Sequence, residues 1–259
     1  MRKTTIQILL LFTACFAAMH ATAQRDLPEL NTNPGTLSLV EFQRLFEASK
    51  RWGEFGDDDQ LGSLNLITPQ TRVQAASLVE SGISVSLANP LSKTVEGNFI
   101  EPIGHTTFVF DLPPGFDGGE SAAGDVFNIN YHGGIHSHMD GVAHFGWRGK
   151  LYNGFDFEPG KDGFANVGVE HIAQHGIFGR GVLVDLPRLY QINHLPPGTV
   201  IEAEHLEAWE RHTGTTIGSG DILLLRVGRW QIAKDDPDYD ALEATAGIPA
   251  SIGPWLKAR

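Results

Sequence analysis

The sequence predicts a single α/β domain, and three features carry this prediction. Three segments repeat apolar residues at helical spacing, five short segments are apolar or alternating between turns, and no internal repeat or low-complexity tract is present. Apolar residues make up 41% of the chain and aromatic residues 9%, which excludes an intrinsically disordered protein. We therefore expect one folded core.

Three helices are expected, and each has a recognisable beginning or end. A serine or threonine precedes the first two as N-cap, a glutamate completes a capping box in the first, and a proline opens the second. Glycine ends the second and the third. The segments are 39–50 after Ser38, 69–81 between Thr68 and Gly82, and 203–213 before Gly214.

Five strands are expected between these helices, at residues 84–91, 105–112, 126–133, 181–187 and 221–228. The last two are nearly continuous apolar runs, a pattern typical of strands buried on both faces of a sheet. The third leads directly into a histidine-rich segment. We therefore expect the histidines to continue this strand.

Residues 1–24 have the pattern of a cleavable signal peptide. Two basic residues precede an apolar run, and small residues precede the expected cleavage site. We expect a secreted or periplasmic protein with a surface leader over 25–37 and a folded domain over 38–259. The only cysteine, Cys15, lies within the signal, so the mature chain can form no disulfide.

The charge balance excludes partners that need a basic surface. The chain has 19 basic and 31 acidic residues, and loss of the signal leaves 17 basic residues and a net charge of −14. Nucleic acids and anionic membranes attract basic proteins, so we expect neither as a partner. No segment reaches the ~20 apolar residues of a spanning helix. A small molecule is the expected partner.

The segment "YHGGIHSHMDGVAHFG" places four histidines and an aspartate within thirteen positions. Alternate side chains of a strand share a face, so His136, His138 and Asp140 would point the same way, together with His132. Two imidazoles and a carboxylate suit Zn²⁺ or Mn²⁺, and three protein ligands leave a position for water, as in catalytic sites. His144 lies out of phase with this face, which favours a role as proton shuttle. We expect His136, His138 and Asp140 as the metal ligands.

Two other metal-binding patterns use similar residues but fit this chain less well. Cupin-type oxygenases carry His-x-His on a strand and a glutamate three or four residues later, where this chain has Val142 and Ala143. Metalloproteases with His-Glu-x-x-His need this motif on a helix, and the chain does not contain it. Adventitious metal binding by surface histidines remains as the alternative.

The stretch "HSHMDGVAHF" resembles the second half of the signature His-x-Gly-Thr-His-x-Asp-x-Pro-x-His. This signature belongs to the cyclase family of metal-dependent hydrolases, which includes kynurenine formamidases and isatin hydrolase. The resemblance implies that His138 and Asp140 are metal ligands and that His144 is the catalytic histidine. The first ligand of the family falls on Gly134. We expect His136, or alternatively His132, to take its place.

The resemblance covers most of residues 50–257, including "RWGEFGDDDQLGSLNLIT", "GWRGKLYNG" and "GIFGRGVLVDLPR". It implies a swivelling β/β/α domain, hydrolysis of amide-type carbon–nitrogen bonds and a homo-oligomer. Family members continue past the "PWL" region with strands and a helix that carry further ligands. The resemblance therefore predicts that the C-terminal part is missing from this chain.

Four residues are expected to bind the substrate. Trp52 and Phe55 lie in a loop rich in Gly and Asp and could form apolar walls, and Lys150 and Tyr152 follow the histidine motif closely. The favoured function is an exported hydrolase that opens an amide, imide or N-formyl bond with metal-activated water. The alternatives are a non-catalytic, metal-binding secreted protein and a metal-dependent cyclase or lyase.

Overall fold

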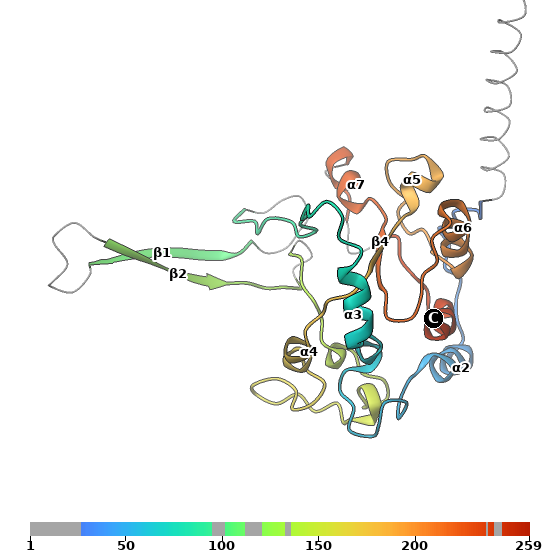
Figure 1. Cartoon of the computed structure of the whole chain (residues 1–259), viewed down its shortest axis with the longest axis horizontal. Helices are drawn as coiled ribbons and strands as arrows, with labels where there is room; N and C mark the ends of the chain where they lie inside the picture. The colour runs from blue at the N-terminus through green and yellow to red at the C-terminus, as the bar shows by residue number, and fades with distance from the viewer. Residues whose placement is uncertain (1–26, 95–101, 112–120, 133–135, 237, 241–244) are drawn as a thin grey trace, which may run out of the picture.

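The computed structural model of the 259-residue chain describes residues 27–94, 102–111, 121–132, 136–236, 238–240 and 245–259. This part of the chain combines short helices with two two-stranded sheets (Figure 1). The α-helices are α2 (Leu39–Ser49), α3 (Pro69–Ala76), α4 (Val169–His175), α5 (Leu186–Tyr190), α6 (Ala203–Thr213), α7 (Arg229–Asp235) and α8 (Gly253–Ala258). The strands are β1 (Gly104–Asp111), β2 (Ser121–Asn128), β3 (Gly181–Asp185) and β4 (Ile222–Arg226).

β1 and β2 form an antiparallel hairpin that extends away from the rest of the molecule (Figure 1). The strand expected over 105–112 is confirmed, whereas its partner begins earlier than expected and ends at Asn128. Asn128 pairs with Gly104, the first residue of β1, so the chain beyond Asn128 has no further strand partner in the hairpin. The expectation that the histidine segment continues the strand is therefore wrong.

β3 and β4 pair in parallel, with Gly181 opposite Ile222. Both strands lie within the expected segments, and the mixed helix and strand content is confirmed. Along β3, Val182 and Val184 are buried, whereas Leu183 is 50% exposed. Burial on both faces was therefore a wrong expectation, because the core covers only one face of this sheet.

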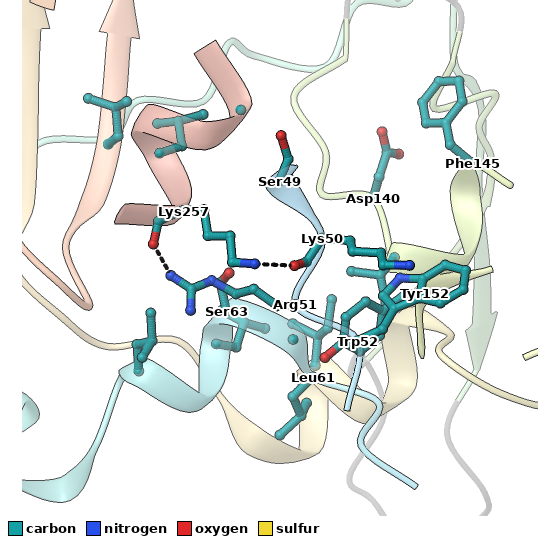
Figure 2. Close-up of a pocket in the computed structure, with 18 of the residues that line it drawn as sticks. Ser49, Lys50, Arg51, Trp52, Leu61, Ser63, Asp140, Phe145, Tyr152 and Lys257 are labelled. Atoms are coloured by element: carbon teal, nitrogen blue, oxygen red, sulfur yellow. Dashed lines mark hydrogen bonds between the residues drawn. The ribbon is translucent and has the colours of Figure 1, made fainter. Parts of the chain in front are cut away.

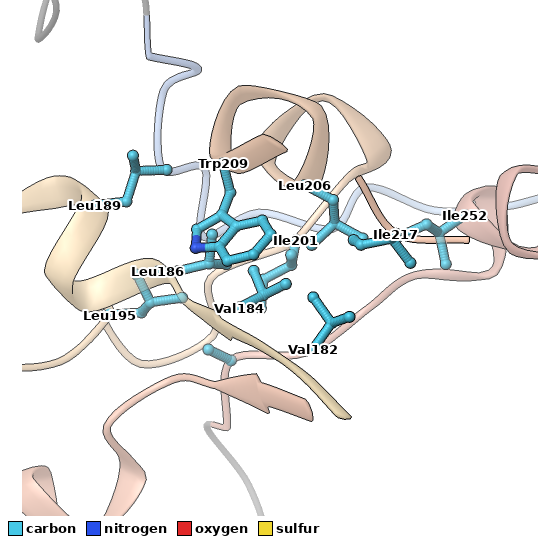
Figure 3. Close-up of a cluster of buried hydrophobic side chains, with 11 residues drawn as sticks. Val182, Val184, Leu186, Leu189, Leu195, Ile201, Leu206, Trp209, Ile217 and Ile252 are labelled. Atoms are coloured by element: carbon cyan, nitrogen blue, oxygen red, sulfur yellow. The ribbon is translucent and has the colours of Figure 1, made fainter. Parts of the chain in front are cut away.

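The main core lies between this sheet and helices α5 and α6 (Figure 3). Trp209 of α6 packs in this core with aliphatic side chains from β3, α5, α6 and the connections between them. Burying one aliphatic side chain of this size stabilises a protein by roughly 1.5–3 kcal/mol. The fully buried members are Val184, Leu186, Leu195, Ile201 and Leu206.

Two expected helices agree closely with the structure. In α2, the Glu41 N–H donates to Ser38 Oγ at 3.2 Å, and the Ser38 N–H donates to the Glu41 carboxylate at 2.9 Å, which completes the capping box. Helix α6 ends at Thr213 and is followed by Gly214, whose φ of 69° lies in the left-handed region that favours glycine. Local signals therefore suffice to predict the start of α2 and the end of α6.

Other local expectations are wrong. Helix α3 ends at Ala76, well before Gly82, and residues 84–91 form no strand and are mostly exposed. Four further helices, α4, α5, α7 and α8, have five to seven residues each. Helices this short are marginal without tertiary contacts, and α8, for example, packs against α2.

The signal peptide expected over 1–24 lies outside the described residues. Within the described part of the chain, no helix combines the length and the apolar character that crossing a membrane requires.

Candidate metal centre and pocket

The histidine-rich segment follows an irregular path that is anchored at Gly141. A Cβ atom at this position would lie 2.8 Å from the backbone nitrogen of Val169, at the start of α4. No side chain fits there without movement of the backbone. Gly141 therefore lets the chain pass close to α4 directly after Asp140.

A short 3-10 turn, Val142–His144, continues this anchor. Its central residue, Ala143, is 5% exposed and packs with Leu151 and Val167 in a second small core. The Ala143 N–H donates to Val167 O at 3.0 Å. The packing and the hydrogen bond of Ala143 thus hold the turn in place, while His144 at its end remains partly exposed.

Three side chains form a group that could hold a metal ion. One ligand atom each from His132, His138 and Asp140 lies within 4.8 Å of the others. His132 Nε2 is 3.0 Å from Asp140 Oδ1, and His138 Nε2 is 3.4 Å from the same oxygen. All three residues are exposed, so an ion from solvent could reach the group.

A hydrogen bond to the backbone orients the ring of His138. Its Nδ1 lies 2.8 Å from His136 O, and a carbonyl oxygen only accepts, so Nδ1 carries the proton. In the neutral ring, the free lone pair is then on Nε2, the atom near Asp140. Metal-bound histidines are usually oriented in this way through their second nitrogen, so these residues fit a divalent ion.

The neighbouring imidazoles keep Asp140 ionised. The hydrogen bond with His132 has the largest effect and lowers the pKa of the Asp140 carboxyl; burial raises it less, and the charges of His144 and His138 lower it further. The pKa therefore lies below its usual value. An ionised carboxylate is the form that binds a metal ion.

His144 lies beside this group. Its Nε2 is 3.9 Å from Asp140 Oδ2, and its ring stacks on His132 with the ring centroids 4.3 Å apart. The His144 side chain is 36% exposed. His144 is therefore close enough to the group to exchange a proton with a molecule bound there.

The structure places His136 apart from this group. His136 is 5% exposed, and among the described residues the group contains His132 in its place. The expectation of His136 as a ligand relied on the alternation of a strand, and residues 136–141 form none. The structure thus favours the alternative, His132. Gly134, the position of the family's first ligand, lies outside the described residues.

A pocket of about 1100 Å³ adjoins the group (Figure 2). Asp140 and His144 contribute to its wall. Aromatic residues from α2 and the loops near it also line the pocket, with Trp147 centred 4.8 Å from Phe42 and Trp52 centred 5.8 Å from Phe46. The pocket therefore combines a possible metal site with a largely apolar wall.

Three of the four residues expected to bind the substrate line this pocket: Trp52, Lys150 and Tyr152. Phe55 is half-buried and is not part of its described lining. Lys150 forms an ion pair with Asp156. Their contact with a substrate stays a prediction.

Two residues with a positioning role were missed in the sequence. Asp59 accepts hydrogen bonds from Tyr152 Oη at 2.7 Å and from Gly62 N at 2.9 Å. Asn153 accepts from Gly53 N at 2.7 Å and donates to Gly56 O at 2.9 Å, which holds the loop after Trp52. The signals that could have revealed them are the Asp-Gln-Leu-Gly and Tyr-Asn-Gly turns.

Comparisons with known proteins agree with this architecture. No curated protein matches the chain significantly. A crystal structure described as a novel cyclase matches with a TM-score of 0.68 and 27% sequence identity, over 82% of this chain and 73% of that chain. The model of the cyclase family matches residues 69–259, which is more than half of the chain. This protein therefore belongs to the cyclase family.

Proposed function

We propose that this protein is a metal-dependent hydrolase that opens an amide, imide or N-formyl carbon–nitrogen bond of a small molecule. One observation carries the proposal: the group formed by His132, His138 and Asp140 lies next to His144, and Asp140 and His144 line one pocket. Catalytic metal sites typically combine three protein ligands with a nearby proton carrier. The bond type and the swivelling β/β/α fold rest on the resemblance of "HSHMDGVAHF" to amidohydrolases of the family.

Zn²⁺ or Mn²⁺ is the proposed ion, because the available donors are two imidazole nitrogens and a carboxylate oxygen. Such an ion, when bound, lowers the pKa of a water molecule to about 7 and polarises a carbonyl oxygen. His132 and His138 would hold it through Nε2, and Asp140 through its carboxylate.

His144 is the proposed proton shuttle. It would accept a proton from the attacking water and donate it to the leaving nitrogen, which departs poorly as an anion. Asp140 Oδ2, 3.9 Å from His144 Nε2, would stabilise the positive charge on the ring between these two transfers. The aromatic wall would hold the apolar part of the substrate.

The first test compares metal content and turnover in histidine variants. His138→Ala should lose the metal, whereas His144→Ala should keep it and lose activity by about 10²- to 10⁴-fold on a panel of N-formyl and cyclic amides. His132→Ala should lower metal content more than His136→Ala does. His212→Ala, on the exposed end of α6, is the matched control and should change neither.

Equal turnover by His144→Ala and the wild type would rule out the proposed mechanism. A metal-loaded wild type that dehydrates or cyclises hydroxylated molecules but cleaves no amide would indicate the cyclase or lyase alternative. A metal-loaded protein without any turnover would indicate the non-catalytic alternative.

We further propose that the protein is exported and assembles as a homo-oligomer. Export rests on the sequence pattern of residues 1–24, and the mass of the protein recovered from the periplasm or medium would reveal cleavage after about Ala23. Light scattering should give a mass of at least two mature chains, and a mass of one chain would contradict the homo-oligomer.

A further inference from the structure

The described lining of the pocket contains more basic than acidic side chains, whereas the whole chain is acidic. The chain has 31 acidic and 19 basic residues, but among the described residues that line the pocket, Asp140 and Asp221 are the only acids. Asp140 belongs to the proposed metal group, and Asp221 forms an ion pair with Arg180. The basic side chains in the lining are Lys50, Arg51, Lys150, Lys257 and Arg259.

Four of these five cations have a carboxylate partner, and none of the four partners is part of the described lining. Lys257 differs from them. Its Nζ donates to Lys50 O at 2.6 Å, and no carboxylate in the described part of the chain forms a salt bridge with it. The pairs are Lys50–Glu47, Arg51–Glu54, Lys150–Asp156 and Arg259–Glu210.

Lys257 is held by a reciprocal connection between α8 and the end of α2. Arg51 Nη2 donates to Lys257 O, while Lys257 Nζ donates to Lys50 O (Figure 2). An ammonium group has three donors, and this bond uses one. Lys257 therefore has a half-buried, positioned ammonium group with donors for a ligand.

A half-buried cation without a counter-charge has lost part of its hydration, so an anionic ligand that reaches it is favoured. In Figure 2, Lys257 and Asp140 lie on different sides of Ser49. A single ligand in this pocket could thus present one group to the metal centre and another to Lys257.

We propose that Lys257 forms an anion subsite and that the substrate is an amide or imide with a carboxylate apart from the scissile bond. This inference rests on the proposed function for the reaction, but the subsite itself is inferred from Lys257, the lining cation without a salt bridge among the described residues. The substrate class thus becomes an acylated or cyclic amide with an acidic substituent.

Calorimetry on the full metal-loaded chain tests this with two probes of similar shape, phenylacetate and the neutral 2-phenylethanol. Phenylacetate should bind about tenfold more tightly, the scale of one charge-assisted hydrogen bond. Lys257→Gln keeps a donor for Lys50 O but removes the charge, so it should abolish this preference. Lys161→Gln removes an exposed lysine outside the described pocket lining and is the matched control, with no change expected.

Equal binding of the two probes, or an unchanged preference in Lys257→Gln, would overturn the anion subsite. If Lys257→Gln does not fold, the wild type still decides, since phenylacetate binding should weaken in 0.5 M salt and 2-phenylethanol binding should not. Repeating the titration after chelation separates the proposals. Loss of the preference would place the carboxylate at the metal and overturn the subsite. A preference that is retained after chelation, combined with no amide turnover by the metal-loaded protein, would contradict only the proposed function.

Discussion

The hydrogen bond between Tyr152 and Asp59 should contribute measurably to stability, and Tyr152→Phe removes it without removing the ring. Tyr152 Oη lies 2.7 Å from Asp59 Oδ2, and both side chains are partly buried. Asp59 retains donors from Asn65 and from the Gly62 N–H, so the loss should fall at the low end for a bond to a charged group, about 1.5 kcal/mol. For a domain of this size, we expect Tm to fall by about 3–6 °C at pH 7.

The effect should depend on pH with a definite sign. Burial raises the pKa of Asp59, but the hydrogen bonds from Tyr152, Asn65 and the Gly62 N–H together lower it below its usual value. A carboxyl group with a depressed folded-state pKa stabilises the fold above its unfolded pKa of about 4, and this contribution is lost as the pH falls through the folded value. The difference in Tm between wild type and Tyr152→Phe should therefore be full at pH 6–7 and shrink below about pH 4.

Tyr190→Phe is a matched control, because Tyr190 Oη donates at 2.7 Å to the neutral carbonyl of Pro28. It should lower Tm through the loss of one neutral hydrogen bond, about 1 kcal/mol, with little change between pH 7 and pH 4. Thermal denaturation followed by circular dichroism measures both variants. An unchanged Tm of Tyr152→Phe at pH 7, or a difference that stays constant below pH 4, would refute the reasoning.

Three further predictions concern other parts of the molecule. Gly141→Ala places a Cβ 2.8 Å from Val169 N, so metal titration should show roughly 10- to 100-fold weaker binding while the fold persists. Arg180→Met leaves the Asp221 carboxylate buried without its partner. Burial has the largest effect and raises the pKa of this carboxyl, but the hydrogen bonds from Arg180 and the Gly218 N–H, together with the charge of Arg180, lower it below its usual value. Urea denaturation should show a loss of roughly 2–4 kcal/mol at pH 7 that shrinks below pH 4, because Asp221 then becomes neutral. Asn153→Ala removes the hydrogen bonds to the loop before it and puts alanine at a φ of 59°, so Tm should fall by about 4–8 °C. The Tm of Asn153→Gly should fall less, because glycine adopts this φ without strain.

Local interactions explain which parts of the fold could be predicted from the sequence. The capping box of Ser38 and Glu41 and the glycine after Thr213 act within one helical turn, so the ends of α2 and α6 could be predicted closely. The sequence predicted both strands of the hairpin but placed β2 too late, because the start of β2 depends on its pairing with β1. Helices α5 and α8 were missed because packing, more than any periodic pattern, stabilises such short segments.

The same distinction applies to the candidate site. The residue types around His138 and Asp140 predicted a nitrogen and oxygen metal site with His144 beside it, and the structure groups His138 and Asp140 and places His144 near them. The choice of third ligand could not follow from alternation, because the chain leaves the strand before His132. His136 turns inward and His132 takes its place in the group.

The sequence by itself determined the donor atoms, the helix caps and the family resemblance, because each depends on residues a few positions apart. Only the tertiary structure decided that His132 joins His138 and Asp140, and that Lys257 of α8 lines the same pocket as Asp140. The physical reason is that both outcomes depend on the path of the backbone between distant segments. That path is set by nonlocal contacts, such as the close approach of Gly141 to α4 and the packing of α8 on α2.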